Sequence, residues 1–124
     1  NLKLEDFIIF TGFIPSDHIP SLYGLFDIFV HAAKEEPFGL VIAEAMLNKL
    51  PIVSTNTGAA KDAITTKENG YTIEYENLDN LHEGIFFIFF FIRKRIGEAA
   101  FKTAMEKYEF QIMYDNHKKL YSSK

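Results

Sequence analysis

The sequence predicts an α/β fold in which a parallel sheet is flanked by helices. Over residues 1–76, short apolar runs alternate with segments whose apolar residues recur at helical spacing. Residues 77–124 show helical spacing alone, which predicts helices that follow the sheet. Hydrophobic residues make up 48% of the 124-residue chain and charged residues 24%, a balance typical of globular proteins. No segment rich in glycine, proline or serine divides the chain, so we expect residues 1–124 to form one domain.

Each expected strand is a short apolar run bounded by turn residues. These runs are Phe7–Phe10, Asp27–His31, Pro51–Ser54 and Tyr71–Tyr75. The helices expected between them begin after capping residues or a proline. They cover Ile19–Phe26 after Ser16 and Asp17, Phe38–Lys49 after Pro37, and Ala59–Ile64. Strands that alternate with helices in this way pair in parallel, with helices on both faces of the sheet.

The helical part is expected to begin at Leu78, where Asn77 and Asp79 are suitable capping residues. We expect the first helix to end at the basic stretch 93–95, after Ile92. Two further helices are predicted by apolar stripes. The stripes are Ile96, Ala100, Ala104 and Tyr108, and then Phe110, Met113, His117 and Leu120.

Charge and composition exclude several classes of protein. The chain carries 17 acidic and 13 basic residues, a net charge of −4, which argues against a nucleic-acid-binding domain. Without cysteine it has neither disulfides nor thiolate metal sites. The chain opens without a signal peptide, so a cytoplasmic location is expected. The histidines lack metal-ligand spacing, and we expect neither a metal nor another cofactor. They are His18, His31, His82 and His117.

The longest apolar run, Ile85–Ile92, is too short to span a bilayer, which takes about 20 helical residues. It contains Phe86–Phe91 and is followed by Arg93, Lys94 and Arg95. One interpretation is a helix packed under the sheet. The others are an interfacial membrane anchor or a surface for self-association, since aromatic residues beside basic ones suit a membrane surface.

The helix predicted over Phe38–Lys49 carries the most informative side chain. Glu44 is the only charged residue between Phe38 and Leu47. A helix that is apolar on nearly every side is expected to be buried, and a buried carboxylate needs compensating hydrogen bonds or a ligand. The alternative is a structural ion pair with a lysine such as Lys49 or Lys61.

A second carboxylate, Glu36, lies just before this helix, eight residues ahead of Glu44. At a rise of about 1.5 Å per residue, the two lie roughly 12 Å apart along the axis. Between them are the free amides of the helix start at Phe38, Gly39 and Leu40, which favour a phosphate. This helix tip follows a strand and lies at the carboxyl edge of the sheet, where such folds bind ligands. An anion site with an acceptor at each end suits a nucleotide-sugar, although Glu36 with its neighbour Glu35 could simply complement the helix dipole.

The wider string Glu36-Pro37-Phe38-Gly39-Leu40-Val41-Ile42-Ala43-Glu44-Ala45-Met46 resembles the E-x7-E segment of retaining GT-B glycosyltransferases of the group 1 (family 4) type. The similarity extends over nearly the whole chain. It includes Gly12–Pro15, Leu22–Val30, Pro51–Thr55 with Gly58, and Asn69–Tyr71.

The resemblance implies a partial Rossmann-like sheet, from the C-terminal half of the GT-B fold, followed by C-terminal helices. It implies transfer of a sugar from a nucleotide-sugar with retention of configuration, without a metal. Glu36 would contact the transferred sugar, as nucleophile or as stabiliser of the reacting carbon, and Glu44 would bind the ribose. The amides of Gly39 and Leu40 would hold the diphosphate. Phe38, Gly58 and His31 are further candidates for binding the substrate.

The chain departs from the family pattern at several positions. Ala33 stands where a serine is usual, Lys49 where a glycine is usual, Ala59 for the second of two glycines and Asp62 for a glutamate. The family's N-terminal acceptor-binding domain, and the arginine and lysine that clamp the diphosphate, would both precede Asn1. We therefore expect this chain alone to be incomplete, with weak donor binding and negligible transfer. A non-catalytic binding or interaction module derived from the same fold is the alternative.

Overall fold

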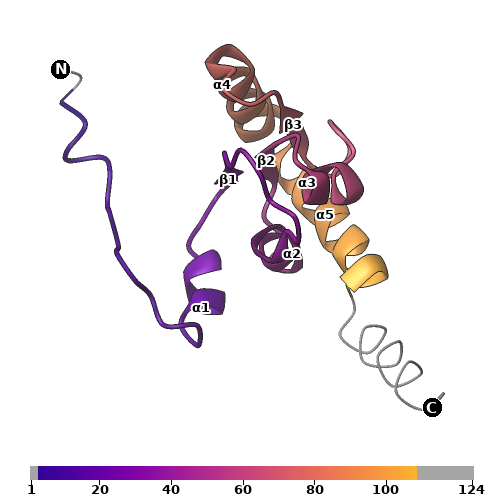
Figure 1. The fold of residues 1–124 in the computed structure, drawn as a ribbon, viewed down its shortest axis with the longest axis horizontal. Helices are drawn as coiled ribbons and strands as arrows, with labels where there is room; N and C mark the ends of the chain where they lie inside the picture. The colour runs from indigo at the N-terminus through magenta and orange to yellow at the C-terminus, as the bar shows by residue number, and fades with distance from the viewer. Residues whose placement is uncertain (1–2, 109–124) are drawn as a thin grey trace.

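The computed structural model describes residues 3–108 and has helices on both sides of a small sheet (Figure 1). In chain order its elements are α1 (Ile19–Tyr23), β1 (Phe29–His31), α2 (Leu40–Leu47), β2 (Ile52–Thr55), α3 (Gly58–Ala63), β3 (Tyr71–Ile73), α4 (Leu78–Phe87), η1 (Ile88–Ile92) and α5 (Arg93–Tyr108). The α/β class predicted from the sequence is confirmed. No helix among the described residues has the length and apolar character needed to cross a membrane.

The sheet has three strands in the order β1-β2-β3, and both pairings are parallel. Every residue of the central strand β2 is buried, as expected for a parallel strand covered on both faces. Successive side chains of a strand point to opposite faces. Ile52 therefore enters one core and Val53 the other.

The two cores lie on opposite sides of the sheet. One is built mainly by α2, α3 and α5, and its larger members include Ile42, Met46 and Ile52. The other joins Val53 and Tyr71 to residues of η1 and α5, including Ile88 and Ile96. Figure 1 shows α2 below the sheet and α4 above it. The carboxyl edge of the sheet is left for the loops that follow the strands.

The strand predicted over Phe7–Phe10 does not form, so that prediction is wrong. This segment has no place in the sheet, and Phe7 and Phe10 are exposed. Figure 1 shows the N-terminal segment running apart from β1. An apolar run becomes a strand only where a neighbour completes its hydrogen bonds, and no described strand lies beside this one.

The predicted helix ends also need correction. Asn77 caps α4 as expected, since its Oδ1 accepts a hydrogen bond from the Asn80 amide at 3.0 Å. The helix does not end at residue 93, because η1 is a π-helical turn that leads directly into α5. A π turn adds a residue to the helical path without a glycine or proline break. The cap expected at Ser16 and Asp17 is replaced by His18, whose side chain makes no cap hydrogen bond. The predicted helix over 110–120 lies outside the described residues.

Candidate functional site

The candidate site lies where β1 and β2 end and where α2 and α3 begin. His31 ends β1, and Glu36 follows in the loop before α2. The Ala59 amide, at the start of α3, donates to the Glu36 carbonyl at 3.2 Å. The structure thus brings His31, Glu36, Gly39 and Gly58 to one edge of the sheet, as the order of the elements predicted.

The Glu36 side chain closes the start of α2. Its Oε1 accepts hydrogen bonds from the amides of Gly39 at 2.9 Å and Phe38 at 3.2 Å. These two hydrogen bonds hold the pKa of the Glu36 carboxyl below its ordinary value of 4.5, and the bond from the Gly39 amide has the larger effect. The positive end of the helix favours the ionised form further. Glu36 is therefore a carboxylate at neutral pH.

His31 lies on the other side of this carboxylate. Its Nε2 is 3.7 Å from Glu36 Oε2, and its Nδ1 is 3.5 Å from the hydroxyl of Ser54, a fully buried residue of β2. The His31 side chain is 14% exposed and that of Glu36 is 26% exposed, so both can be reached from solvent. When protonated, His31 would add positive charge beside Glu36.

The helix-tip amides are less available than the sequence suggested. The Gly39 amide, expected to hold a phosphate, already donates to Glu36. The Leu40 amide, the other one expected to hold the diphosphate, donates no hydrogen bond among the described residues. A phosphate at this tip would therefore compete with the Glu36 carboxylate for the Gly39 amide.

Gly39 and Gly58 lie at the two helix starts under different constraints. Gly39 has φ 65°, and a Cβ at this position would come within 2.5 Å of the Ala59 Cβ. The fold therefore requires glycine there. A Cβ on Gly58 would meet nothing within 4 Å. Neither packing nor backbone conformation requires a glycine at Gly58, which leaves open space at the start of α3.

Glu44 is exposed, contrary to the expectation that it would be buried. The helix α2 buries Ile42, Ala45 and Met46 and turns its opposite face, with Leu40 and Glu44, to solvent. The alternative of a lysine partner is also wrong, because Lys49 pairs with Glu98 at 3.2 Å and, among the described residues, neither Lys61 nor Glu44 takes part in an ion pair. Glu44 instead accepts a hydrogen bond at 3.1 Å from the hydroxyl of Tyr23.

Tyr23 is the site residue that the sequence analysis missed. It is 6% exposed, lies at the end of α1, and its hydroxyl reaches both Glu44 and the Val41 carbonyl. Burial, together with the Glu44 carboxylate, raises the pKa of Tyr23 to about 12, so this hydroxyl remains a donor. Tyr23 and Glu44 are 21 residues apart in sequence, and no local spacing pattern connects them.

Two apolar candidates flank the tip of α2. Phe38 is 81% exposed and Leu40 is 66% exposed, so neither belongs to a core.

Thr57, which precedes α3, has a buried hydroxyl with no hydrogen-bond partner among the described residues. In the part of the chain that the structure describes, no group of three or more histidine or acidic side chains is placed to hold a metal ion.

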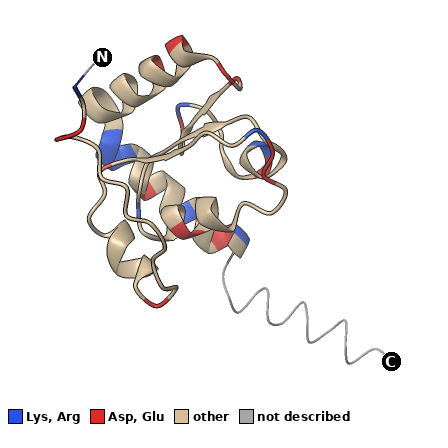
Figure 2. Cartoon of the chain, turned by 60° about the vertical axis from the view of Figure 1, so that its left-hand side comes forward, with Lys and Arg blue, Asp and Glu red and all other residues tan. Residues whose placement is uncertain are grey.

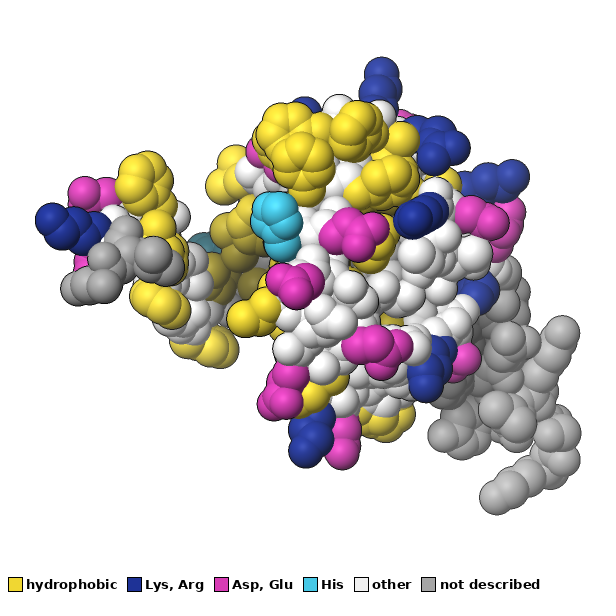
Figure 3. Space-filling model, turned by 90° about the horizontal axis from the view of Figure 1, so that it is seen from above, with side chains coloured by type: hydrophobic (Ala, Val, Ile, Leu, Met, Phe, Trp, Pro, Cys, Tyr) yellow, Lys and Arg dark blue, Asp and Glu magenta, His cyan; other side chains and the backbone are white. Residues whose placement is uncertain are grey.

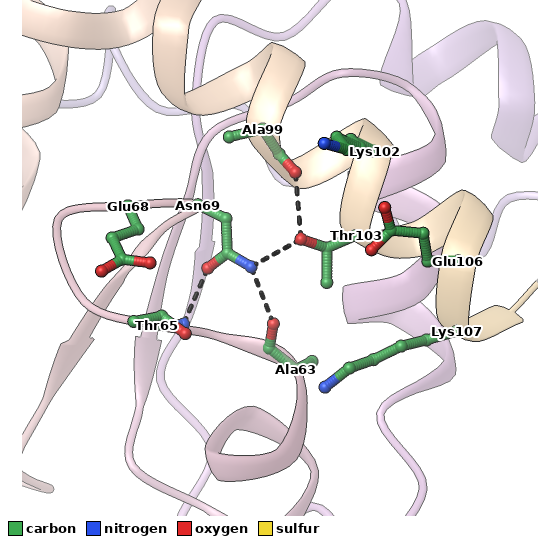
Figure 4. Close-up of a pocket in the computed structure, with 9 residues that line it drawn as sticks. All are labelled: Ala63, Thr65, Glu68, Asn69, Ala99, Lys102, Thr103, Glu106 and Lys107. Atoms are coloured by element: carbon green, nitrogen blue, oxygen red, sulfur yellow. Dashed lines mark hydrogen bonds between the residues drawn. The ribbon is translucent and has the colours of Figure 1, made fainter.

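A separate cavity of about 390 Å³ lies between the loop 65–69 and α5 (Figure 4). This loop precedes β3, so the cavity is at the amino edge of the parallel sheet, opposite the candidate site. Its central side chain, Asn69, accepts from the Thr65 amide and donates to the Ala63 carbonyl and to Thr103. These bonds fasten the loop to α5 and identify Asn69 as a structural residue.

Comparison with known proteins agrees with this arrangement. Residues 1–100 match the family described as Glycosyl transferases group 1. Spore coat protein SA of Bacillus subtilis (strain 168) is 31% identical over 116 residues, which cover 90% of this chain and 31% of that protein. The chain spans 19% to 31% of the length of three curated relatives that it matches.

Solved structures share the fold, and two of them illustrate the similarity to this chain. The C-terminal domain of a glycosyl transferase group 1 family protein from Francisella tularensis matches with a TM-score of 0.78 and 34% identity, over 85% of this chain and 55% of that one. Anabaena HepE in complex with UDP-glucose matches with a TM-score of 0.89 and 27% identity, over 98% of this chain and 34% of that one. The parallel sheet flanked by helices is thus a Rossmann-like domain of the GT-B type. The chain belongs to the group 1 glycosyltransferase family.

Proposed function

We propose that the chain binds the donor in a glycosyltransferase that moves a sugar from a nucleotide-sugar with retention of configuration. The observation that carries this proposal is the start of α2, an amide-rich helix tip with Glu36 on one side and the exposed Glu44 farther along the helix. The structural similarity to HepE, solved in complex with UDP-glucose, supports a nucleoside diphosphate sugar as the ligand class.

The proposed roles follow the order of groups along α2. The diphosphate lies at the amides of Gly39 and Leu40, with Phe38 and Gly58 beside it. Glu44 accepts hydrogen bonds from the ribose hydroxyls, and Tyr23 holds its carboxylate in place. Glu36 and His31 lie on the sugar side, where Glu36 acts as nucleophile or stabilises positive charge at the reacting carbon.

The hydrogen bonds of Glu36 add one step to this scheme. Its carboxylate accepts the hydrogen bond of the Gly39 amide in the structure. A diphosphate, which carries more negative charge, would displace it and leave Glu36 to turn toward the sugar. The same amides then stabilise the negative charge that grows on the diphosphate as the glycosidic bond breaks. This stabilisation comes from backbone dipoles and needs no metal.

The acceptor and its binding site belong to the rest of a longer protein in this proposal. The chain spans at most 31% of the length of the three relatives compared above, and the family match ends at residue 100. We therefore expect the 124-residue chain to bind donor weakly and to transfer sugar negligibly.

Titration calorimetry of the 124-residue chain with UDP and with UDP-glucose tests the site. Glu44→Gln is expected to weaken UDP binding roughly tenfold, the effect of losing a hydrogen bond to a charged group. Glu106→Gln is the matched control, because this exposed glutamate lies on α5 beside the cavity at the opposite edge. Equal affinities of wild type and Glu44→Gln would refute the assignment.

Glu36→Gln separates the two sides of the site. Removing the competing carboxylate is expected to leave UDP binding unchanged or tighter, while the added affinity for the glucose unit falls. If the variant loses UDP binding to the same extent as Glu44→Gln, the proposed competition at the Gly39 amide is wrong.

A non-catalytic binding module is the second candidate function. It is favoured by Ala33 and Ala59, which replace residues usual in the family pattern. Slow release of glucose from UDP-glucose, abolished by Glu36→Gln, would support the transferase, and α-glucose as the first product would support retention. Tight UDP-glucose binding with no glucose release would support the module.

A further inference from the structure

The outer side of α4 and η1 carries a group of exposed phenylalanines. Their exposed fractions are 48% for Phe86, 46% for Phe89, 64% for Phe90 and 68% for Phe91. We call these four residues the aromatic face. Ile88, from the same run, is fully buried in the core that contains Val53, Tyr71 and Ile96. The structure thus divides the apolar run, so that one side packs against the sheet and the other faces solvent.

The aromatic face is a continuous surface. The ring centroids of Phe86 and Phe90 are 4.6 Å apart, and those of Phe89 and Phe90 are 5.2 Å apart. Phe86 also meets Phe91 at 6.1 Å. Rings packed on one another have already lost side-chain freedom, so their burial against a partner costs less entropy. Exposed aromatic clusters of this kind are typical of interaction surfaces.

Basic residues border the aromatic face on one side. Arg93, Lys94 and Arg95 follow directly at the start of α5, and with Phe91 and Glu98 they line a hollow of about 460 Å³. Figure 2 shows the basic stretch where η1 meets α5. Figure 3 shows hydrophobic side chains gathered on this side, with basic ones along one margin and acidic ones along another. This local positive charge stands out in a chain whose net charge is −4.

We propose that this surface docks onto an anionic lipid bilayer. The phenylalanines would enter the boundary between headgroups and acyl chains, and the basic residues would meet lipid phosphates. The described residues contain no helix able to cross a membrane, so the chain would lie on the surface.

Charge also argues against one arrangement of a second copy of the chain as the occupant. A two-fold dimer in which the two η1 segments run parallel would bring two copies of residues 93–95 close together, and like charges at a buried contact oppose association. An antiparallel dimer would separate them, and sedimentation equilibrium tests that arrangement below. Arg93 is already engaged by Asp27 and lies over the Phe89 ring at 5.3 Å. Arg95 Nη2 donates a hydrogen bond to the Lys67 carbonyl at 3.5 Å, but Arg95 is exposed and pairs with no carboxylate among the described residues, so Lys94 and Arg95 are the cations to test.

Co-sedimentation with lipid vesicles tests the proposal on the 124-residue chain. Wild type is expected to bind vesicles of phosphatidylcholine with 30% phosphatidylglycerol, and to bind pure phosphatidylcholine at least tenfold more weakly. Added salt should weaken binding to the anionic vesicles because it screens the basic residues. Equal binding to both vesicle types, or binding to neither, would overturn the proposal.

Phe89→Ser with Phe90→Ser is expected to reduce anionic-vesicle binding at least tenfold. Lys94→Gln with Arg95→Gln should also reduce it and should remove its salt dependence. Phe10→Ser with Phe13→Ser is the matched control, because these rings are 93% and 92% exposed but lie in the N-terminal segment without the basic border. Circular dichroism checks that each variant folds.

Two outcomes would identify another occupant. If the Phe10 and Phe13 variant loses binding as strongly as the Phe89 and Phe90 variant, general stickiness explains the result and the proposal is wrong. If sedimentation equilibrium shows a wild-type dimer that the Phe89 and Phe90 variant abolishes, while neither binds vesicles, the surface joins two copies of the chain.

Discussion

The two ends of α2 are held in place by different kinds of contact. At its start, Glu36 accepts hydrogen bonds from the amides of Phe38 and Gly39, all within four residues of sequence. At its far end, Glu44 meets Tyr23 from α1, and Lys49 adopts φ 58° in the turn that follows. The start of the helix is thus organised locally, whereas its end depends on distant residues and contains a strained backbone position.

The backbone at Lys49 shows why the family pattern has a glycine at this position. A glycine is usual at the position of Lys49, and the left-handed conformation there is one that glycine adopts without strain. Lys49 still makes an ion pair with Glu98 and lies over the Phe101 ring at 5.1 Å. These surface contacts offset part of the backbone strain.

The largest expected effect comes from breaking the start of the helix with Gly39→Ala. The variant combines a left-handed backbone with a Cβ that would lie 2.5 Å from the Ala59 Cβ. We expect the free energy of unfolding to fall by about 3 kcal/mol, from backbone strain and overpacking together. Urea denaturation measures it. Gly58→Ala, which meets no atom within 4 Å, is the control and should change stability by less than about 0.5 kcal/mol.

Farther along α2, Tyr23→Phe removes the hydroxyl that donates to Glu44 and keeps the aromatic ring in the core. We expect a loss of about 1 kcal/mol in the free energy of unfolding, typical of one hydrogen bond. The same denaturation experiment measures it. A loss above about 3 kcal/mol would mean that the ring itself has moved.

Lys49→Gly should stabilise the chain, because it relieves the left-handed strain. After loss of the exposed ion pair, we expect a net gain of about 0.5 kcal/mol. Lys49→Ala is the matched variant, since it loses the ion pair and keeps the strained backbone, and it should be less stable than wild type. If both variants are destabilised equally, the strain at Lys49 is negligible.

The pH dependence of stability tests the role of Glu36 at the start of α2. Because the pKa of Glu36 is lower in the folded state, its carboxylate stabilises the fold above pH 4.5, and this contribution is lost as pH falls below that value. Glu36→Gln cannot ionise, so the stability difference between wild type and variant should shrink from pH 6 to pH 3. Urea midpoints at the two pH values check this. An unchanged difference would contradict the role of Glu36 in capping α2.

The smallest expected effect on stability is that of Glu44→Gln. The amide oxygen can still accept the Tyr23 hydroxyl, and the residue is exposed. The free energy of unfolding should stay within about 0.5 kcal/mol of wild type. A weaker affinity for UDP in the same variant would then be a property of the site and not of the fold.

Much of the fold could be predicted from the sequence, because the relevant signals are local. The runs that became β1, β2 and β3 each lie within an expected strand or within a residue of its end. The helix expected over Phe38–Lys49 forms, but it begins two residues later, at Leu40, with Gly39 as its N-cap, and ends at Leu47. The strand expected over Phe7–Phe10 failed because apolar composition cannot supply a neighbouring strand.

The candidate site, like the fold, was predictable only where the signals are local. The sequence by itself determined the parallel order of elements and the helix tip with Glu36, since strand–helix alternation and capping act over a few residues. Only the tertiary structure decided that Glu44 faces solvent, that Tyr23 is its partner, and that the Phe86–Phe91 run divides between core and surface. Burial depends on which distant elements pack on a helix, and a helix that is apolar all round does not specify the side they cover.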